Sequence, residues 1–284
     1  MSSLSVPVTV VIPTLNEQDR IVACLASVSW ADEVIVADGG STDETVAAAI
    51  AAGARVLTGC GPTIADQRNA AIAAASHDWV LALDADERAT PALLAAIAAM
   101  IAAPTHEAYA IRMQNQYLGA PMTRGGWGRD WHVRLFRAEL RYEVKRVHEG
   151  LAFAGEAGEL QGTIEHDSYR DLYHHLSKVT TYSRWGADDL RQRGRTAGMS
   201  HLVGRPLWRF IKAYLVDGNW RDGRRGFVFS VIHAWSAFAK YALLWDHERQ
   251  AQQGRDQAAL AAVPTPARRV HAPRHADALV ATES

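Results

Sequence analysis

The stretch VTVVIPTLNEQDRIVACLASVSWADEVIVADGGSTD, from Val8 to Asp43, decides the fold. Its β-branched run Val8–Ile12 predicts a strand, and apolar residues at helical spacing predict a helix over Glu17–Ser29. The run EVIVA, Glu33–Ala37, predicts a second strand that ends at a turn-rich DGGSTD. This order of strand, helix and strand predicts a parallel β-α-β unit.

The same alternation continues to about residue 113. The predicted elements are an Ala-rich helix to Ala52, a strand at Ala54–Leu57, a helix at Ala65–Ala75, a strand at Trp79–Leu83, a helix at Thr90–Ala103 and a strand at Glu107–Met113. Strands that alternate with helices of this length predict an α/β fold with a doubly wound, mostly parallel sheet flanked by helices. Such sheets bind ligands beyond the carboxyl ends of their strands.

The pattern changes from about Gln114. A Gly- and Trp-rich stretch predicts a long loop, and short strand-like pieces follow at Val133–Phe136, Leu140–Val144 and Gly162–His166. We therefore expect one domain over 1–169, with a change of pattern between 1–113 and 114–169. Residues 170–250 predict a helical, basic and aromatic extension, and residues 251–284 predict a disordered tail.

The net charge of −1 conceals two opposed parts of the 284-residue chain. Residues 1–103 carry 12 Asp and Glu against 4 Lys and Arg, whereas residues 104–284 carry 19 against 26. Two cysteines exclude a disulfide framework and a thiolate zinc cluster. No leader peptide is expected, and the longest apolar stretch, Gly226–Trp245, contains His233 and Lys240. We expect a soluble or membrane-surface protein.

Acidic residues follow three of the predicted strands. The three segments are PTLNE at 13–17, DGGSTD at 38–43 and DAD at 84–86. Each alone suits a helix start, a turn or a strand end. Parallel strands would bring all three to one edge of the sheet, where like charges repel one another unless a cation relieves them. Mg²⁺ or Mn²⁺, which prefers oxygen ligands and bridges carboxylates to phosphates, suits this edge.

These segments resemble glycosyltransferase family 2, which has the GT-A fold. The resemblance rests on VTVVIPTLNEQDRI, VIVADGGSTDET, ADQRNAA and VLALDADE, and it is most similar to the bacterial lipopolysaccharide-core glucosyltransferase branch. It covers Val8–Met113 strongly. It implies a GT-A catalytic domain over 1–169, with 1–113 as the nucleotide-sugar-binding half and 114–169 as the acceptor and catalytic half. It extends more loosely through RLFR, RYEVKRVHEG, HDSY and GFVFSVIHAWSAFAKYALLW.

The resemblance implies roles for residues in these motifs. Those implied to bind the nucleotide sugar are Thr14, Asn16, Glu17, Asp38 at a pyrimidine such as uracil, Arg68 near the diphosphate or donor sugar, and Asp84 near the ribose. Asp86 and His166 are the implied ligands of Mg²⁺ or Mn²⁺.

The resemblance also implies a catalytic carboxylate at Glu149, which would take the proton of the acceptor hydroxyl in a single displacement with inversion. In the family an acidic pair is usual at this place, whereas here His148 precedes the glutamate. Whether His148 assists in acceptor binding or proton transfer is left open. Asp130, in the Gly-rich stretch, is the rival base.

The basic segment has two interpretations. Arg205, Arg209 and Lys212 recur on one helical face. Another side is apolar and aromatic, as in helices that lie in a membrane interface, and carries Leu207, Ile211 and Leu215 beside Trp208 and Tyr214. Alternatively, these helices pack against the catalytic domain or a partner chain. Nucleic acid is not expected, because no binding motif is present.

The expected activity is transfer of a hexose, taken to be glucose, from a UDP-sugar to a hydroxyl of a membrane-associated glycolipid such as the lipopolysaccharide inner core. An anionic glycan acceptor and an anionic membrane surface are the expected partners. The expected location is cytoplasmic, at the inner face of the cytoplasmic membrane. Alternatives are transfer to a soluble protein or polysaccharide, and a non-catalytic membrane- or sugar-binding module.

Overall fold

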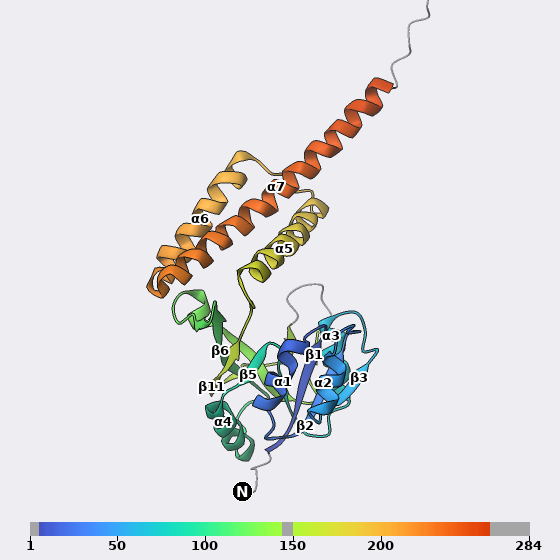
Figure 1. Ribbon diagram of the computed structural model, residues 1–284, viewed down its shortest axis with the longest axis vertical. Coiled ribbons are helices and arrows are strands. Elements are labelled where there is room, and N and C mark those ends of the chain that lie inside the picture. Colours follow the sequence, from blue (N-terminus) through green and yellow to red (C-terminus); the bar gives the residue numbers. More distant parts are fainter. Residues whose placement is uncertain (1–5, 144–149, 262–284) are drawn as a thin grey trace, which may run out of the picture.

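The computed structural model describes residues 6–143 and 150–261 of the chain. They form an α/β domain and, from residue 172, a helical extension that lies beside it (Figure 1). The strands are β1 (Val6–Thr14), β2 (Ala31–Asp38), β3 (Arg55–Thr58), β4 (Trp79–Ala82), β5 (Glu87–Ala89), β6 (Ala108–Tyr117), β7 (Ala120–Pro121), β8 (Trp131–Arg137), β9 (Arg141–Tyr142), β10 (Leu151–Ala152) and β11 (Gly158–His166). The helices of the α/β domain are α1 (Gln18–Ser27), α2 (Thr45–Ala51), α3 (Ile64–Ala73), α4 (Pro91–Ala102) and the 3₁₀ turn η1 (Gly126–Arg129).

The main sheet of the described residues has the order β3-β2-β1-β4-β8-β6-β11-β5, with β7 paired to β6. Strands β3, β2, β1 and β4 are parallel to one another, as are β6 and β11. The expected α/β class, with a mostly parallel sheet flanked by helices and a helical C-terminal extension, is confirmed. Because β1 is central, both of its faces are covered, and its residues form an almost unbroken apolar run.

Alternation along the central strands divides the core between the two faces of the sheet. Val10, Ile12 and Leu81 pack with α1, α2 and α4 on one face. Val11 and Val80, each one residue out of step with them, pack with α3 on the other. Caps fix two of the covering helices, since the Thr63 and Thr90 side chains accept backbone N–H groups at the starts of α3 and α4. The carboxyl ends of the strands are thereby held at one rigid edge.

The structure differs from the sequence-based expectation between residues 107 and 131. The strand predicted at 107–113 was expected to close the parallel series, but β8 runs antiparallel between β4 and β6. The predicted loop from Gln114 is also shorter than expected, because β6 continues to Tyr117. Its register with the later strand β11, from Tyr109–Gly158 to Asn115–His166, supplies hydrogen-bond partners that local sequence does not reveal.

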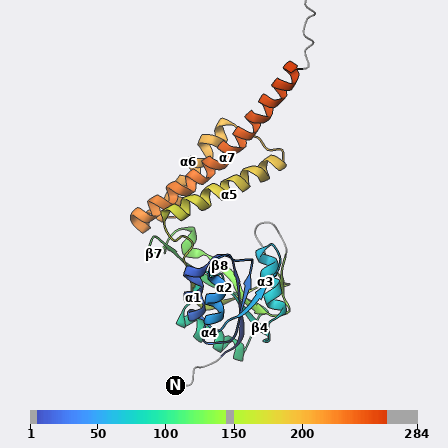
Figure 2. The same ribbon diagram turned by 45° about the vertical axis from the view of Figure 1, so that its right-hand side comes forward.

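The extension consists of packed helices α5 (Leu172–Gln192), α6 (Arg205–Ile211) and α7 (Gly223–Ala261). Short helical turns η2 (Ser200–Gly204), η3 (Lys212–Val216) and η4 (Asn219–Asp222) flank α6 and lead into α7. Figures 1 and 2 both show α5 and α7 side by side, with α7 projecting beyond the other two helices. Buried Ala187, Tyr241 and Leu244 form the contact between α5 and α7.

The expectation of a disordered tail from residue 251 is wrong for residues 251–261, where α7 continues. Extending an existing helix needs no new nucleation, and the sequence AQQGRDQAALA lacks proline and is rich in good helix formers. Residues 262–284 lie outside the described part.

Aromatic rings join the extension to the α/β domain. Phe229 of α7 packs against Trp127 at 4.4 Å and Tyr117 at 5.5 Å between ring centroids. His175 of α5 stacks on Tyr169 at 3.9 Å, and its Nδ1 lies 2.9 Å from the Tyr117 hydroxyl. The start of α5 is therefore fixed directly above the carboxyl-end edge of the sheet.

Candidate active site

The three acidic segments meet at one edge of the sheet, as the sequence predicted. The register pairs Thr14 with Asp38 across β1 and β2, and Val11 with Ala82 across β1 and β4. Asp84 lies two residues beyond Ala82, so the ends of three neighbouring strands share one level. The segments PTLNE, DGGSTD and DAD therefore surround a common site.

The first two segments bind one another. Asn16 adopts a left-handed conformation, with φ of 56°, and its side-chain oxygen accepts the Thr42 N–H at 2.8 Å. The buried Asp38 carboxylate accepts the Gly40 N–H at 2.9 Å and the Ser41 hydroxyl at 2.6 Å. The Thr14 carbonyl accepts the Gly39 N–H at 2.8 Å. Asp38 thus shapes its own loop, and its predicted contact with a pyrimidine stays a prediction.

Two buried arginines hold Asp84. Arg68 Nη2 lies 2.5 Å and Arg134 Nη2 3.0 Å from the two oxygens of the Asp84 carboxylate. Arg134 also pairs with Glu87, whose side chain is fully buried. Glu87 in turn accepts the Asp84 N–H at 2.9 Å, which closes the turn between the two acids. Arg68, predicted beside a diphosphate, lies in this cluster, and its phosphate contact stays a prediction.

The cluster separates the pKa values of its two carboxyls. Burial raises the pKa of Asp84, but the charges of Arg134 and Arg68 outweigh it and hold that pKa well below its usual range. Burial raises the pKa of Glu87 to about 7, because Arg134 offsets it only in part and the negative Asp84 adds to it. Asp84 therefore stays ionised at pH values where Glu87 takes up a proton.

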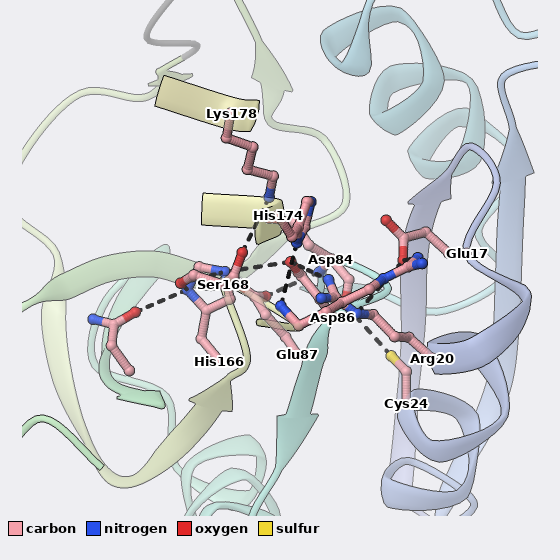
Figure 3. A network of polar contacts seen from close by, with 12 residues as sticks. Glu17, Arg20, Cys24, Asp84, Asp86, Glu87, His166, Ser168, His174 and Lys178 are labelled. Atoms are coloured by element: carbon pink, nitrogen blue, oxygen red, sulfur yellow. Dashed lines mark hydrogen bonds and ion pairs between the residues drawn. The ribbon is translucent and has the colours of Figure 1, made fainter. Parts of the chain in front are cut away.

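The predicted metal ligands Asp86 and His166 come together, with 3.6 Å between Asp86 Oδ2 and His166 Nε2. The antiparallel pairing of β5 with β11, which sets His166 opposite Glu87, produces this approach. Arg20 of α1 also reaches Asp86, at 3.2 Å. Figure 3 shows Asp86 between Arg20 and His166, with Glu17 nearby.

A hydrogen-bond chain orients the imidazole of His166. Asn115 Nδ2 donates to Asp130 at 3.0 Å, so the amide oxygen of Asn115 faces His166 Nδ1 at 2.9 Å. If Nδ1 donates to that oxygen, the lone pair of Nε2 points toward Asp86, which is the tautomer a metal ligand needs. Burial lowers the pKa of His166, but the contact with Asp86 and the charges of Asp86, Glu87 and Asp84 raise it more. A raised pKa favours the protonated ring, so Nε2 must lose its proton before a metal binds there.

The donor set fits a Mg²⁺ or Mn²⁺ ion that the protein holds by only two side chains. Two neighbouring ligands of one octahedral ion at about 2.1 Å lie about 3 Å apart, close to the separation of Asp86 and His166. Among residues 6–143 and 150–261, no group of three or more His, Cys, Asp or Glu side chains forms a closed metal cage. Such ions usually keep waters and substrate phosphates as further ligands.

Of the predicted bases, Asp130 is among the described residues. Asp130 accepts from Asn115 and lies 2.9 Å from His132 Nε2, and these contacts lower its pKa despite its burial. Asp130 therefore orients the Asn115 amide, and a lowered pKa makes its carboxylate a weaker base. Glu149 and His148 lie outside the described residues, so their predicted roles stay predictions.

A cavity of about 320 Å³ opens next to the Asp84 cluster. Arg68, Arg134, Tyr142, Trp131 and Phe153 line it together with neighbouring residues. A larger cavity, of about 550 Å³, lies at the opposite end of β4 and contains none of the predicted site residues. The smaller cavity is the one that the site chemistry can use.

Several residues of the site were not predicted from the sequence: Arg20, Glu87, Asn115, Arg134 and Arg170. Arg170 lies 3.4 Å from Glu17 and 3.2 Å from Asp19, so it ties the segment before α5 to α1. One signal was available, since an arginine between apolar residues in the strand WHVRLFR needs a buried anion.

Comparison with known proteins adds the family. The model of glycosyl transferase family 2 matches residues 9–151, half of the chain. An uncharacterised glycosyltransferase of Rickettsia typhi is 29% identical over 81% of this chain and 84% of its own. The lipopolysaccharide core biosynthesis glycosyltransferase LpsC of Rhizobium meliloti is 28% identical over 89% of this chain and 97% of its own.

The chain is also similar to solved structures. Glucosyl-3-phosphoglycerate synthase of Mycobacterium tuberculosis, solved with Mn²⁺, UDP and glucosyl-3-phosphoglycerate, matches with a TM-score of 0.33 and 28% identity. The match covers 38% of this chain and 44% of that one, so it spans less than half of either protein.

Proposed function

Because the chain belongs to glycosyl transferase family 2, and is therefore a nucleotide-sugar-dependent glycosyltransferase, we propose that it transfers a hexose from a UDP-sugar to a membrane-associated glycolipid. The observation that carries the proposal is the Asp86–His166 pair at the carboxyl-end edge of the sheet. This pair lies beside Glu17, in the segment implied to hold the nucleotide. The lipopolysaccharide core role of the relative LpsC supports a glycolipid acceptor.

On the donor side, Asp86 and His166 would hold a divalent ion against the diphosphate, with Asn115 fixing the imidazole. The bound ion would supply charge that stabilises the leaving diphosphate. Glu17 and Asp84 would position the nucleoside. Arg68 and Arg134 hold the Asp84 carboxylate in one orientation, so it needs no rearrangement when the donor binds.

On the acceptor side, a carboxylate takes the proton of the attacking hydroxyl, and we assign that role to Glu149. Asp130 is the less suitable base, because Asn115 and His132 already occupy its two oxygens. The cavity of about 320 Å³ beside Asp84 would receive the acceptor sugar.

The extension supplies a surface suited to an anionic membrane. Large apolar side chains stand exposed along one face of α7, at Phe227, Val231, Trp235, Phe238 and Trp245. Trp208 of α6 is 60% exposed and Tyr173 of α5 is 83% exposed. Contiguous exposed apolar side chains on a protein surface mark interaction sites.

Basic groups of the extension lie near one another on α6 and α7. Arg205 of α6 and Lys240 of α7 both lie over the ring of Tyr241, at 5.2 and 5.1 Å from its centroid. Burial lowers the pKa of Lys240, and the positive charges of Arg209 and Arg205 lower it further. Together, exposed tryptophans and clustered bases are typical of helices that lie in the headgroup region of anionic bilayers. The segment Asn219–Arg255 is long and apolar enough to cross a bilayer by length and composition alone. We propose instead that it lies on the inner face of the cytoplasmic membrane, because Lys240 sits mid-helix among other bases.

The donor assignment is tested by turnover of purified protein with UDP-, GDP- and ADP-hexoses in Mn²⁺ or Mg²⁺, in the presence of extracted inner-core glycolipid. Transfer from a UDP-hexose that depends on metal and on the glycolipid is the expected result. A preference for a GDP- or ADP-sugar would overturn the uridine assignment, and equal transfer to a soluble glycan would overturn the glycolipid assignment.

The membrane assignment is tested by co-sedimentation of the full chain with vesicles of phosphatidylethanolamine and phosphatidylglycerol. Trp235→Glu should weaken vesicle binding by about tenfold, since it places a charge in the apolar face. Ile50→Glu is the matched control, because Ile50 is 60% exposed, against 51% for Trp235, but lies on α2 of the α/β domain. Wild-type protein that stays in the supernatant at low salt would contradict the membrane assignment.

A further inference from the structure

Helix α5 turns two nitrogen-bearing side chains toward the site. His174 and Lys178 are four residues apart, so they share one face of the helix. Figure 3 shows Lys178 and His174 extending from α5 toward Asp86 and His166, which come from the α/β domain. The extension thus contributes side chains to the donor site.

Lys178 is connected to the metal-ligand pair by short contacts. Its Nζ donates to the Ser168 carbonyl at 3.1 Å, and the Ser168 hydroxyl lies 3.3 Å from both ring nitrogens of His166. His166 Nε2 is the atom that faces Asp86. Lys178 Nζ therefore lies two contacts away from the atom that would bind the metal.

The Lys178 ammonium has no anionic partner in the described part of the chain. Its contacts there are the neutral Ser168 carbonyl and the ring of Tyr169, 5.6 Å from Nζ to the centroid. A half-buried cation without a counter-ion is unfavourable unless a ligand supplies one. The position of Lys178 therefore suits an anion that arrives with the substrate.

His174 adds a neutral donor beside this cation. Its Nδ1 accepts the Arg170 N–H at 3.2 Å, which leaves the proton of the neutral ring on Nε2. Burial lowers the pKa of His174, and the charges of Lys178, Arg20 and Arg170 lower it further. Arg20 already pairs with Asp86, and Arg170 with Glu17 and Asp19. Among the described residues, Lys178 is therefore the one of these three cations that has no carboxylate partner.

We propose that Lys178, with His174 beside it, binds the diphosphate of the nucleotide-sugar donor. The inference rests on the proposed function, because it requires a nucleoside diphosphate sugar. In the transfer, the bond from the anomeric carbon to the β-phosphate oxygen breaks, and its electron pair stays on that oxygen. The acceptor oxygen forms the new bond and loses its proton to the base. Lys178 neutralises the charge that develops on the diphosphate.

The test measures binding of inorganic pyrophosphate with Mn²⁺ by calorimetry, because pyrophosphate carries no base or sugar. Lys178→Met should weaken this binding by about 10- to 100-fold, the effect of losing a charge-assisted hydrogen bond. Lys178→Arg should restore most of the affinity, whereas a purely structural lysine would give no such charge-dependent rescue. Arg184→Met, an exposed cation on another face of α5, is the matched control and should bind as wild type does.

Thermal unfolding of each variant separates folding from binding. Equal pyrophosphate affinity in wild type and Lys178→Met, or no binding by folded wild type, would overturn the proposal. The uridine assignment is tested separately, by comparing UDP with GDP and ADP in wild type. Loss of pyrophosphate affinity in Lys178→Met together with a preference for GDP would retain the inference and refute the uridine donor.

Discussion

Replacing Arg134 by methionine should destabilise the protein strongly. Arg134 lies 3.0 Å from Asp84, pairs with the fully buried Glu87 and is itself buried. Removing one partner of a buried ion pair costs about 3–5 kcal/mol, because the other charge stays buried without compensation. Asp84 keeps Arg68 at 2.5 Å, so we expect the lower end of that range, about 3 kcal/mol.

The assay is thermal and urea unfolding at about pH 8, where Glu87, with its pKa of about 7, is ionised. A loss of about 3 kcal/mol lowers Tm by roughly 6–12 °C in a domain of this size. The loss should shrink at about pH 5, where Glu87 is protonated and needs no counter-ion. Arg112→Met is the control, because Arg112 is an exposed arginine in the neighbouring strand β6.

A double variant tests the cause. Glu87→Gln combined with Arg134→Met removes both charges, so it should be more stable than Arg134→Met alone. Two results would refute the reasoning: an Arg134→Met protein within about 1 kcal/mol of wild type, or a double variant whose loss equals the sum of the single losses.

Three further predictions concern other contacts. Asn115→Leu should weaken Mn²⁺ binding about 10- to 100-fold, since it frees the His166 ring; unchanged affinity in a Mn²⁺ titration would contradict this. Wild-type stability should fall as pH rises from about 4.5 through 7, because burial raises the pKa of Glu87 above its unfolded value; Glu87→Gln should show a flatter urea-unfolding profile. Gly226→Ala should lower Tm, because a Cβ there would lie 1.8 Å from the backbone oxygen of Asn219. Gly254→Ala, in open space on the same helix, should leave Tm unchanged or raise it. Equal changes in Tm for the two variants would count against the packing of η4 on α7.

The edge that holds the site could be predicted from sequence because it depends on local signals. β-branched runs such as Val8–Ile12, followed by turn residues and helical spacing, specify parallel strands whose carboxyl ends coincide. Asp38, Asp84 and Asp86 immediately follow such runs, so their assembly needs only the strand order. Thr90 was likewise recognisable as a helix cap.

Contacts set by distant strand pairings could not be predicted. Arg134 reaches Asp84 because β8 inserts antiparallel beside β4, and a strand of seven residues carries no signal for its neighbour. Asn115 faces His166 through the β6–β11 register, across 51 residues of chain. The lysine of α5 near the site depends on aromatic packing at Tyr169, which sequence periodicity does not encode.

The most direct test of the central claim is calorimetric titration of UDP into wild-type protein and Asp86→Asn, each with and without Mn²⁺. The account predicts UDP binding in wild type that requires Mn²⁺ and is lost in Asp86→Asn, because Asp86 and His166 hold the ion that joins the protein to the diphosphate. UDP binding that is independent of Mn²⁺, or is as tight in Asp86→Asn as in wild type, would contradict it.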